Sequence, residues 1–218
     1  MPHSSLETHW PLFGLAVRTP RLELRHPDDG MECELAGVAA DGIHDPEFMP
    51  FSIPWTDVSP PEQQRNTMQF FWRMRADWKP DDWHLVMAVV IDGEAAGVQG
   101  ATGAHFAERR VGSTGSWLGR AYQGSGYGKE MRAAMLHLLF EGLGAERCES
   151  AAWEDNAPSL GVSRSLGYEE NGDEWLLRRG QRDRQIGLVL TRERWEAHRP
   201  PYDIEIHGLE PCREMFGA

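Results

Sequence analysis

The sequence has few cysteines, no long apolar run and fewer basic than acidic residues. Its three cysteines, Cys33, Cys148 and Cys212, are odd in number and widely spaced, which excludes a disulfide framework and indicates a reduced, cytoplasmic protein. No apolar stretch approaches the ~20 residues that cross a bilayer, and the first residues lack the features of a signal peptide, so no membrane partner is expected. With 22 Lys and Arg against 34 Asp and Glu, the net charge of −12 argues against a nucleic-acid partner.

Motifs for metals and enzyme nucleophiles are missing as well. The nine histidines are dispersed, and neither His-Glu-x-x-His nor Cys-x-x-Cys occurs, so no metal cofactor is expected. There is no Gly-x-Ser-x-Gly elbow for a nucleophilic serine. Two phosphate-binding patterns also fail: a Walker loop needs lysine where Ser125 stands, and the glycines around it match no register of Gly-x-Gly-x-x-Gly.

The composition is that of one folded domain. Apolar residues make up 40% of the chain and charged residues 26%, which is enough for a core and argues against wholesale disorder. We expect a single domain over residues 1–199. The tail at 200–218 has no clear period, so we expect it to pack on a neighbouring subunit or to be partly disordered. A homodimer or higher homo-oligomer is the default expectation.

Hydrophobic periodicity predicts strands and helices in alternation, which gives an α/β (α+β) fold: a mixed sheet with helices on both faces. Prolines and aromatic residues make 42–60 irregular but too apolar for a free linker, so we expect an ordered loop folded against the core. The strands are expected at 21–26, 84–91, 95–103, 111–118, 147–153 and 184–190. The helices are expected at 29–41, 61–78, 129–143 and 191–198.

A glycine-rich stretch between an expected strand and helix carries the clearest functional signal. Gly124, Gly126 and Gly128 stand at alternate positions and allow the backbone to turn tightly and approach a ligand closely. The helix that follows presents free N–H groups and a positive dipole end, which favours an anion such as phosphate. A plain glycine-rich turn before a helix is the alternative.

The spacing Gln123-x-x-Gly126-x-Gly128 resembles the pyrophosphate loop of the GCN5-related N-acetyltransferase (GNAT) superfamily, whose members bind acyl-coenzyme A. A second stretch, Asn156-Ala-Pro-Ser159 with the Leu-Gly-Tyr that ends at residue 168, is similar to a segment of its ribosomal-protein and drug-modifying (RimJ/RimL-like) branch. Residues 19–25 resemble the opening strand of that branch. The resemblance covers about 17–195, which we take as the core of the domain.

The resemblance implies a mostly antiparallel sheet of about seven strands that splays apart beside the glycine loop, with the pantetheine arm of the coenzyme in the wedge. Trp117 and Leu118 would then pair through their backbone with that arm. The residues expected to bind coenzyme A are Trp117, Leu118, Gln123, Gly124, Ser125, Gly126, Tyr127, Gly128, Lys129, Asn156 and Ser159.

Acyl transfer to an amine needs a proton acceptor, a stabilised oxyanion and a partner for the leaving thiolate. The resemblance makes Ser159 the candidate for the thiolate, and a serine that only caps its helix is the alternative. Glu154 is the candidate base, since it follows the strand that leads to Asn156. His84 and His105 border the wedge, and a structural role is the alternative for each.

The default activity is direct transfer of acetyl from acetyl-CoA to a primary amine in a ternary complex. A closer resemblance, carried by residues 9–13, 44–52 and 54–56, is to a mycobacterial and actinobacterial subgroup that includes a succinyl-CoA-using transferase. Succinyl-CoA is therefore the alternative donor, and a non-catalytic acyl-CoA-binding sensor is the alternative of another class. Thioesterase-like hydrolysis is a weaker third.

The acceptor is an amine on a small molecule or a protein, and two features bear on it. The acidic chain suits a cationic amine, although acidity for solubility alone is as good an explanation. Four of the nine tryptophans are expected near the acceptor entrance, where aromatic faces suit a cationic or ring-containing ligand; core packing is the alternative for at least half of them. These four are Trp55, Trp78, Trp83 and Trp153.

Overall fold

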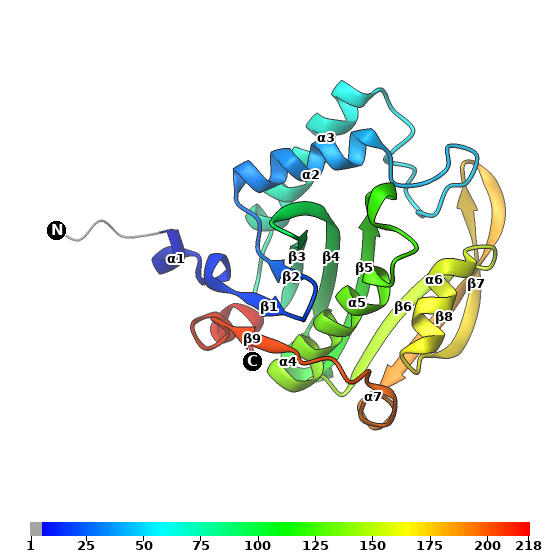
Figure 1. The fold of residues 1–218 in the computed structure, drawn as a ribbon. Helices are drawn as coiled ribbons and strands as arrows, with labels where there is room; N and C mark the ends of the chain where they lie inside the picture. Colours follow the sequence, from blue (N-terminus) through cyan, green and yellow to red (C-terminus); the bar gives the residue numbers. More distant parts are fainter. Residues whose placement is uncertain (1–5) are drawn as a thin grey trace.

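The computed structural model describes residues 6–218, and one nine-stranded sheet runs through it (Figure 1). The strands lie in the order β7-β8-β6-β5-β4-β3-β2-β1-β9, and all neighbours are antiparallel except β5 and β6. The predicted mixed, mostly antiparallel α/β sheet is confirmed, with nine strands where about seven were expected. The strands are β1 Ala16–Arg18, β2 Glu23–Arg25, β3 Asp82–Ile91, β4 Glu94–Ala104, β5 Val111–Leu118, β6 Arg147–Trp153, β7 Glu169–Arg178, β8 Gln181–Thr191 and β9 Glu205–His207.

Helices cover both faces of the sheet. On one face lie α2 and α3, and on the other lies α5, which continues into the π-helical turn η3. The predicted helix at 129–143 is thus an α-helix that ends at His137, followed by one wider turn. The helical segments are α1 Leu6–His9, η1 Pro11–Gly14, α2 Asp29–Asp41, α3 Pro60–Ala76, α4 Phe106–Arg109, η2 Arg120–Tyr122, α5 Tyr127–His137, η3 Leu138–Gly142, α6 Ala157–Ser165, α7 Arg192–His198 and η4 Glu210–Phe216.

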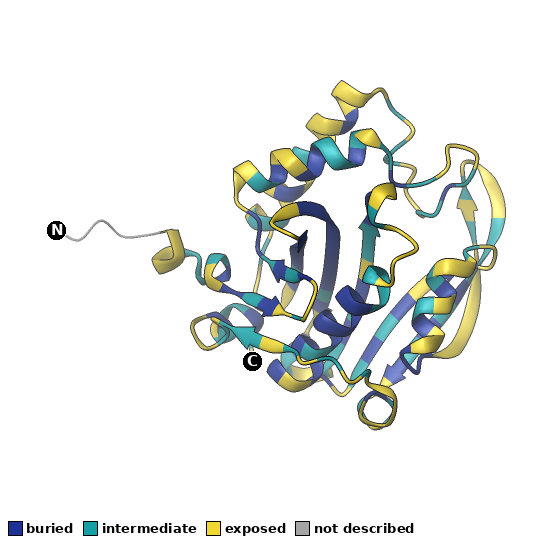
Figure 2. Ribbon diagram, viewed as in Figure 1, coloured by how far each residue is buried: buried dark blue, intermediate teal, exposed yellow. Residues whose placement is uncertain are grey.

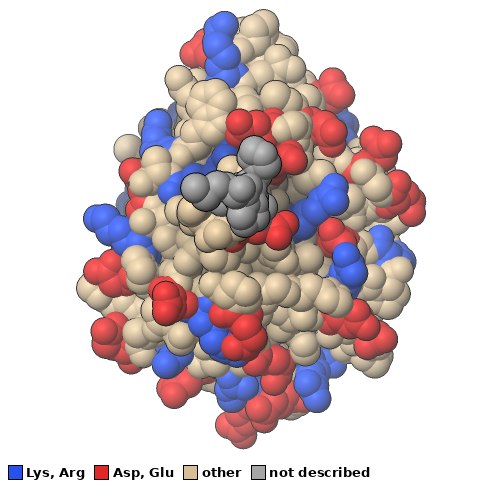
Figure 3. All heavy atoms as spheres, turned by 90° about the vertical axis from the view of Figure 1, so that its left-hand side faces the viewer, with Lys and Arg blue, Asp and Glu red and all other residues tan. Residues whose placement is uncertain are grey.

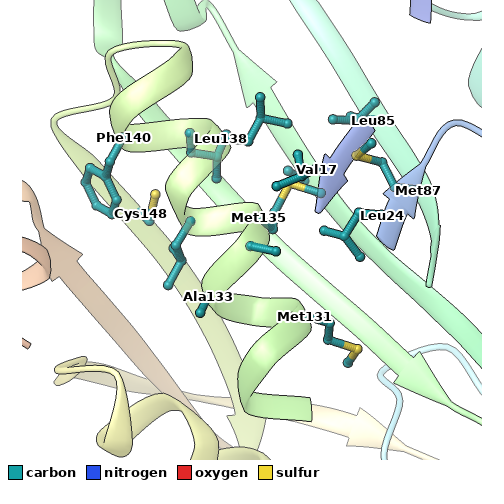
Figure 4. Packing of buried hydrophobic residues seen from close by; sticks show 14 of the residues in the cluster. Val17, Leu24, Leu85, Met87, Met131, Ala133, Met135, Leu138, Phe140 and Cys148 are labelled. Carbon is teal, nitrogen blue, oxygen red and sulfur yellow. The ribbon is translucent and has the colours of Figure 1, made fainter. Parts of the chain in front are cut away.

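The face under α5, called the α5 face below, carries the main core. Alternate residues of β3, from Trp83 to Ile91, belong to this core because successive strand side chains point to opposite sides. Met131 and Met135 of α5 pack over them, with Leu138 of η3 (Figure 4). Burial of so much apolar surface from distant segments is what stabilises the sheet.

The face under α2 and α3, called the α2–α3 face, carries a much smaller core. Leu35 of α2 and Phe71 of α3 pack on Val86 and Ala88 of β3 and on Val98 of β4. The buried part of this cluster stops short of the other end of β3, where His84 is only partly buried and Phe70 is exposed. The two faces of one sheet are therefore filled to different extents.

Three strands escape prediction from the sequence. β1 and β9 are only three residues long, too short to show an alternation. β7 lies at the edge of the sheet, where most of its side chains are exposed (Figure 2), so it has no apolar face to produce a period. Its polar residues pair across the strands instead, as Asp173 does with Arg184 of β8.

The tail after residue 199, for which the sequence indicated packing on a neighbouring subunit or partial disorder, is ordered and packs on the chain's own core. β9 pairs with β1 and extends the sheet by one strand. Cys212 and Phe216 of η4 are fully buried in the main core. The tail shows no hydrophobic period because a three-residue strand and a 3₁₀ helix each bury single, irregularly spaced residues.

The loop from residue 42 to 59 is irregular and folded against the core, as predicted. Ile43 and Met49 are buried, and two arginines of the β7–β8 hairpin hold the loop from outside. Arg178 donates to the Met49 carbonyl, and Arg179 pairs with Asp57. The loop is thereby fixed over the end of the sheet where β5 and β6 part.

Charge is dispersed over the surface. On the side of the molecule in Figure 3, acidic and basic side chains are interspersed. Many are exposed ion pairs such as Arg18 with Glu23, each of which contributes little stability. Over residues 6–218, no helix has both the length and the apolar character required to cross a bilayer.

Candidate active site

The sheet forks between its two parallel strands. β5 and β6 pair over three positions, from Val111 with Arg147 to Ser113 with Glu149, and pair no further. Beyond that point, residues 114–118 of β5 still pair with β4, and residues 150–153 of β6 still pair with β8. The two facing edges from Thr114 and Ser150 onward, which we call the fork, therefore carry backbone groups without a partner strand (Figure 1).

The start of α5 stands beside the open end of the fork. Gly126 is the N-cap residue, at φ 86°, and Gly124 has φ 76°, so both need the left-handed conformation that glycine tolerates. In the described part of the chain, no backbone N–H from Gly124 to Gly128 donates to a protein acceptor. Unbonded amides at the positive end of a helix dipole favour an anion.

The glycine loop is braced from two sides. Gln123 donates from Nε2 to the carbonyls of Ile43 and Leu118, each at 2.8 Å, and so ties the loop to the end of β5. Arg21, between β1 and β2, donates to the Ser125 carbonyl at 3.0 Å and lies over the Tyr127 ring at 4.7 Å. Sequence reasoning missed Arg21 because its contacts span more than a hundred residues.

Two buried charges on α5 have very different surroundings. Glu130, only 1% exposed, accepts from the Thr19 hydroxyl, from the Arg21 backbone N–H and from the Arg21 guanidinium. Arg132 is 5% exposed and has no carboxylate partner among the described residues. Within residues 6–218 it donates to the hydroxyls of Ser116 and Ser150 over a long 3.3 Å each and lies close to the Tyr168 hydroxyl, and its Nε has no partner.

Arg132 lies across the fork, because Ser116 belongs to β5 and Ser150 to β6. Ser150 also donates to the Thr114 carbonyl at 3.3 Å, and the Thr114 hydroxyl lies 3.4 Å from that of Tyr168. Sequence reasoning missed this arginine as well. The sequence does contain a pattern that points to Arg132. It stands inside a run of apolar helix residues, where burying a charge costs free energy unless another group pairs with it.

The second predicted motif lies at the start of α6, beyond β6. Asn156 is the N-cap residue and accepts from the Ser159 backbone N–H at 3.2 Å, so the capping role is present. The Ser159 hydroxyl has no hydrogen-bond partner in the described part of the chain and is partly exposed. It is thus available to a ligand, and Gly128 approaches the same helix near Val162.

The structure does not bring Glu154 to the cavity described next. Glu154 is exposed and pairs with Arg184 at 2.6 Å. Its neighbour Asp155 pairs with Arg178, whose guanidinium holds the pKa of that carboxyl below its usual value. Lys129, in the first turn of α5, is partly buried and has no ion-pair partner among residues 6–218.

A cavity of about 570 Å³ opens on the α2–α3 face and reaches the β5 edge of the fork. Its floor is unusually flat, because Gly100 and Gly115 pair with each other across β4 and β5 in the middle of it. A Cβ added at Gly115 would meet no atom within 4 Å, so the missing side chain is itself part of the space. Aromatic side chains form much of the wall, namely Phe51, Trp55, Phe70, Phe71 and Trp117.

One end of the cavity floor is polar. His84 of β3, Thr102 of β4 and Ser113 of β5 lie side by side in register and line the cavity together. Burial lowers the pKa of His84, so its imidazole is neutral near pH 7. No hydrogen bond to the His84 ring occurs within the described residues, and the ring meets Phe70 edge-on at 5.9 Å.

Of the four tryptophans expected near the acceptor entrance, the structure places Trp55 at the cavity. Trp83 and Trp153 are fully buried core residues, and Trp78 packs on Trp83 and donates to the Met215 carbonyl. Trp117, expected for its backbone, also lines the cavity with its ring, 6.1 Å from that of Trp55.

A mostly antiparallel sheet that forks beside a glycine-rich helix start is the fold of acyl-CoA-dependent N-acetyltransferases. The family model for the acetyltransferase (GNAT) domain matches residues 21–169, and the chain belongs to this family. An uncharacterized N-acetyltransferase, p20, of Bacillus licheniformis is 27% identical over 158 residues, covering 71% of this chain and 82% of that protein.

Solved structures show the same fold at low identity. Mycobacterium smegmatis RimJ in complex with CoA-disulfide has a TM-score of 0.66 and 19% identity, covering 84% of this chain and 90% of that one. A ribosomal-protein-S5-alanine acetyltransferase from Vibrio fischeri has a TM-score of 0.63 and 16% identity, covering 83% and 98%. The predicted membership of the GNAT family is thereby confirmed, and solved structures that share its fold include RimJ.

Proposed function

We propose that the protein transfers an acetyl group from acetyl-CoA directly to a primary amine in a ternary complex. The observation that carries the proposal is the junction of three features: the fork, the unbonded amides at the start of α5, and a cavity that reaches the fork from the opposite face. A coenzyme bound along the fork would present its thioester to an amine held in that cavity.

The coenzyme would be held mostly by backbone. The pyrophosphate fits the amides of residues 124–128 and the dipole of α5, with Lys129 as a further cation. The pantetheine arm fits the free edge of β5 at Trp117 and Leu118, where its amides would pair like an added strand. Asn156 and Ser159, at the start of α6, would hold the arm from the β6 side.

The reaction needs little from the protein beyond placement and proton movement. The amine nitrogen bonds to the thioester carbonyl carbon, the C–S bond breaks, and one proton leaves the nitrogen while the thiolate gains one. We assign the thiolate contact to Ser159, whose hydroxyl is free to donate. Ser159→Ala should lower turnover about tenfold or more, while coenzyme affinity falls much less, because backbone groups supply most of the coenzyme contacts.

Two residues are proposed for the proton acceptor, and they differ in position. Glu154 is the proposal from the sequence, and its pairing with Arg184 would have to open. His84 is neutral, unbonded and inside the cavity, which favours it. If His84 is the base, His84→Gln lowers kcat about 100-fold and removes the acidic limb of the pH profile, while Glu154→Gln stays within twofold. The reverse result assigns the role to Glu154.

Coenzyme binding is tested by thermal stabilisation with coenzyme A and acetyl-CoA. The wild type should be stabilised, because ligand that binds the native state alone raises the midpoint. Gly126→Glu should abolish the shift. Gly93→Glu is the matched control, since Gly93 has φ 87° in the β3–β4 turn and carries the same backbone strain away from the fork. No shift at millimolar coenzyme with the wild type would remove the proposal.

Succinyl-CoA is the second candidate donor, and Arg132 is the observation that favours it. A succinyl group ends in a carboxylate, and Arg132 is a buried cation in the fork that lacks one. Including succinyl-CoA in the thermal series ranks the two donors. Release of coenzyme A that depends on added amine separates a transferase from a non-catalytic acyl-CoA sensor and from a thioesterase.

A further inference from the structure

The cavity on the α2–α3 face has a wall chemistry that restricts what it can hold. Six rings line it from four parts of the chain, and they gather toward two ends. At one end the Trp55 ring lies 5.3 Å from Phe51 and 6.1 Å from Trp117. At the other end Phe70 lies 5.9 Å from His84 and 5.8 Å from Phe71. Between them the floor is the glycine pair.

The charge of the cavity is opposite to the charge of the protein. No aspartate, glutamate or lysine is among its lining residues, although the chain carries a net charge of −12. Its one charged lining residue is Arg73 of α3, which is exposed at the rim and has no ion-pair partner in residues 6–218. A polyamine or another polycation would find no carboxylate here and would meet Arg73 instead.

The shape and lining suit a flat ring. The glycine floor removes two side chains, and planar aromatic walls bind a ring by stacked and edge-on contacts, worth about 1 kcal/mol per pair beyond burial. A volume of about 570 Å³ is in the range of sites for small organic ligands. The cavity is therefore too large to serve an acetyl group alone and is built for an apolar acceptor.

The acceptor's amine would lie at the polar end of the floor. Ser113 stands at the last paired position before the fork, and His84 and Thr102 lie beside it in register. Apolar walls favour the free-base form of an amine over its ammonium form, and the free base is the form that attacks a thioester. A single amine at this end leaves the remainder of the molecule among the rings.

We infer that the acyl acceptor is an aromatic monoamine whose remaining part carries no positive charge. The inference rests on the proposed function, because it takes the cavity as the acceptor site of an acyl-CoA-dependent enzyme. It departs from the expectation that the acidity of the chain attracts a cationic acceptor.

The test measures release of coenzyme A from acetyl-CoA, and from succinyl-CoA if that donor ranks first, with three acceptors: 2-phenylethylamine, spermidine and a peptide that begins with alanine. We expect kcat/KM for 2-phenylethylamine to exceed that for spermidine and for the peptide at least tenfold. A preference for spermidine or for the peptide overturns the inference, and so does the absence of turnover with 2-phenylethylamine in an enzyme that binds acyl-CoA.

A matched pair of variants on α3 locates the acceptor. Phe70 and Trp72 are both exposed aromatic residues, 39% and 49%, but only Phe70 lines the cavity. Phe70→Ala should raise KM for 2-phenylethylamine about fivefold, and Trp72→Ala should leave it within twofold. Equal effects of the two variants would place the acceptor elsewhere.

Two further variants probe charge and volume. Arg73→Glu should shift the ratio of kcat/KM for 2-phenylethylamine over spermidine toward spermidine by about fivefold. Gly115→Val should raise KM for 2-phenylethylamine at least tenfold, because its side chain enters the open space above the floor. An unchanged ratio with Arg73→Glu and an unchanged KM with Gly115→Val would contradict the inference. If acyl-CoA does not raise the unfolding midpoint of the wild type, the proposed function itself is wrong.

Discussion

The two faces of the central sheet are packed differently. On the α5 face, alternate side chains of β3 pack into a buried core that they share with α5, η3 and η4. On the α2–α3 face, the core ends at Val86 and Phe71, and glycines replace side chains further along. One face holds the molecule together, and the other leaves room for a ligand. Substitutions on the two faces should therefore separate stability from activity.

The largest difference is expected between two aromatic residues. Trp83 is buried on the α5 face against Phe106 and Phe216, so Trp83→Ala should lower the free energy of unfolding by about 4 kcal/mol. Phe70→Ala, on the other face, should cost about 1 kcal/mol or less because Phe70 is already 39% exposed. Urea unfolding of both variants measures this. Equal losses of unfolding free energy would mean that the α2–α3 face contributes as much to stability as the main core.

A buried histidine, His26, and a partly buried one, His84, sharpen the comparison through pH. His26 accepts a hydrogen bond from Trp10 Nε1 at 3.2 Å, and burial, with the nearby Arg75 charge, lowers its pKa to about 4. Its unfolded pKa is about 6.5, so its contribution to stability is present above pH 6.5 and is lost as the pH falls through 4. The loss is about 3 kcal/mol over that window.

The check is the free energy of unfolding of wild type and His26→Gln at pH 7 and pH 4. The wild type should lose more stability than the variant by the amount given above. His84 has no such bond, and its substitution should alter the pH dependence of turnover more than that of stability. Parallel stability curves for wild type and His26→Gln would show that His26 is not held neutral by the fold.

The smallest of these effects is a loss of about tenfold in affinity for acyl-CoA when Arg132 is replaced. A buried charge with weak partners costs stability, so Arg132→Met should unfold at the same or a higher urea concentration than the wild type. We expect it to bind acyl-CoA about tenfold more weakly, which is about 1.4 kcal/mol. The thermal shift measures binding, and the unfolding midpoint measures stability.

Arg192→Met is the control for Arg132→Met. Arg192 donates to the carbonyls of Phe140 and Ala145, so its loss leaves backbone acceptors unpaired and should cost about 1–3 kcal/mol without changing the coenzyme shift. If Arg132→Met were the destabilised variant and kept the full shift, Arg132 would be a structural residue like Arg192.

Elements with a long period could be predicted from the sequence, and those fixed by remote partners could not. β5 and β6 were predicted with the bounds that the structure gives, because seven or eight residues with apolar character suffice to identify a strand. β1 lies between β2 and β9 in the sheet, and β9 is held by pairing with β1, which is far from it along the chain. No local pattern contains that information.

The features of the candidate site also fall into those with a local sequence pattern and those formed by residues that are far apart in the sequence. The glycine loop and the Asn156 cap are local devices, and both lie where the spacing placed them. The Arg21 brace, the Arg132 bridge and the cavity each combine residues from separate elements. Their roles as ligand-binding residues stay predictions until they are measured, but their positions follow from packing that the sequence cannot show by itself.

The pairing of β1 with β9 also orders the events of folding in time. A ribosome delivers Val17 long before its partner Ile206, so the outer edge of β1 stays open until Ile206 has been made. Arg213, which caps the η3 turn by donating to the Gly142 carbonyl, arrives later still. A chain stopped near residue 199 would contain every motif of the active site, yet lack the segment that closes the sheet behind it.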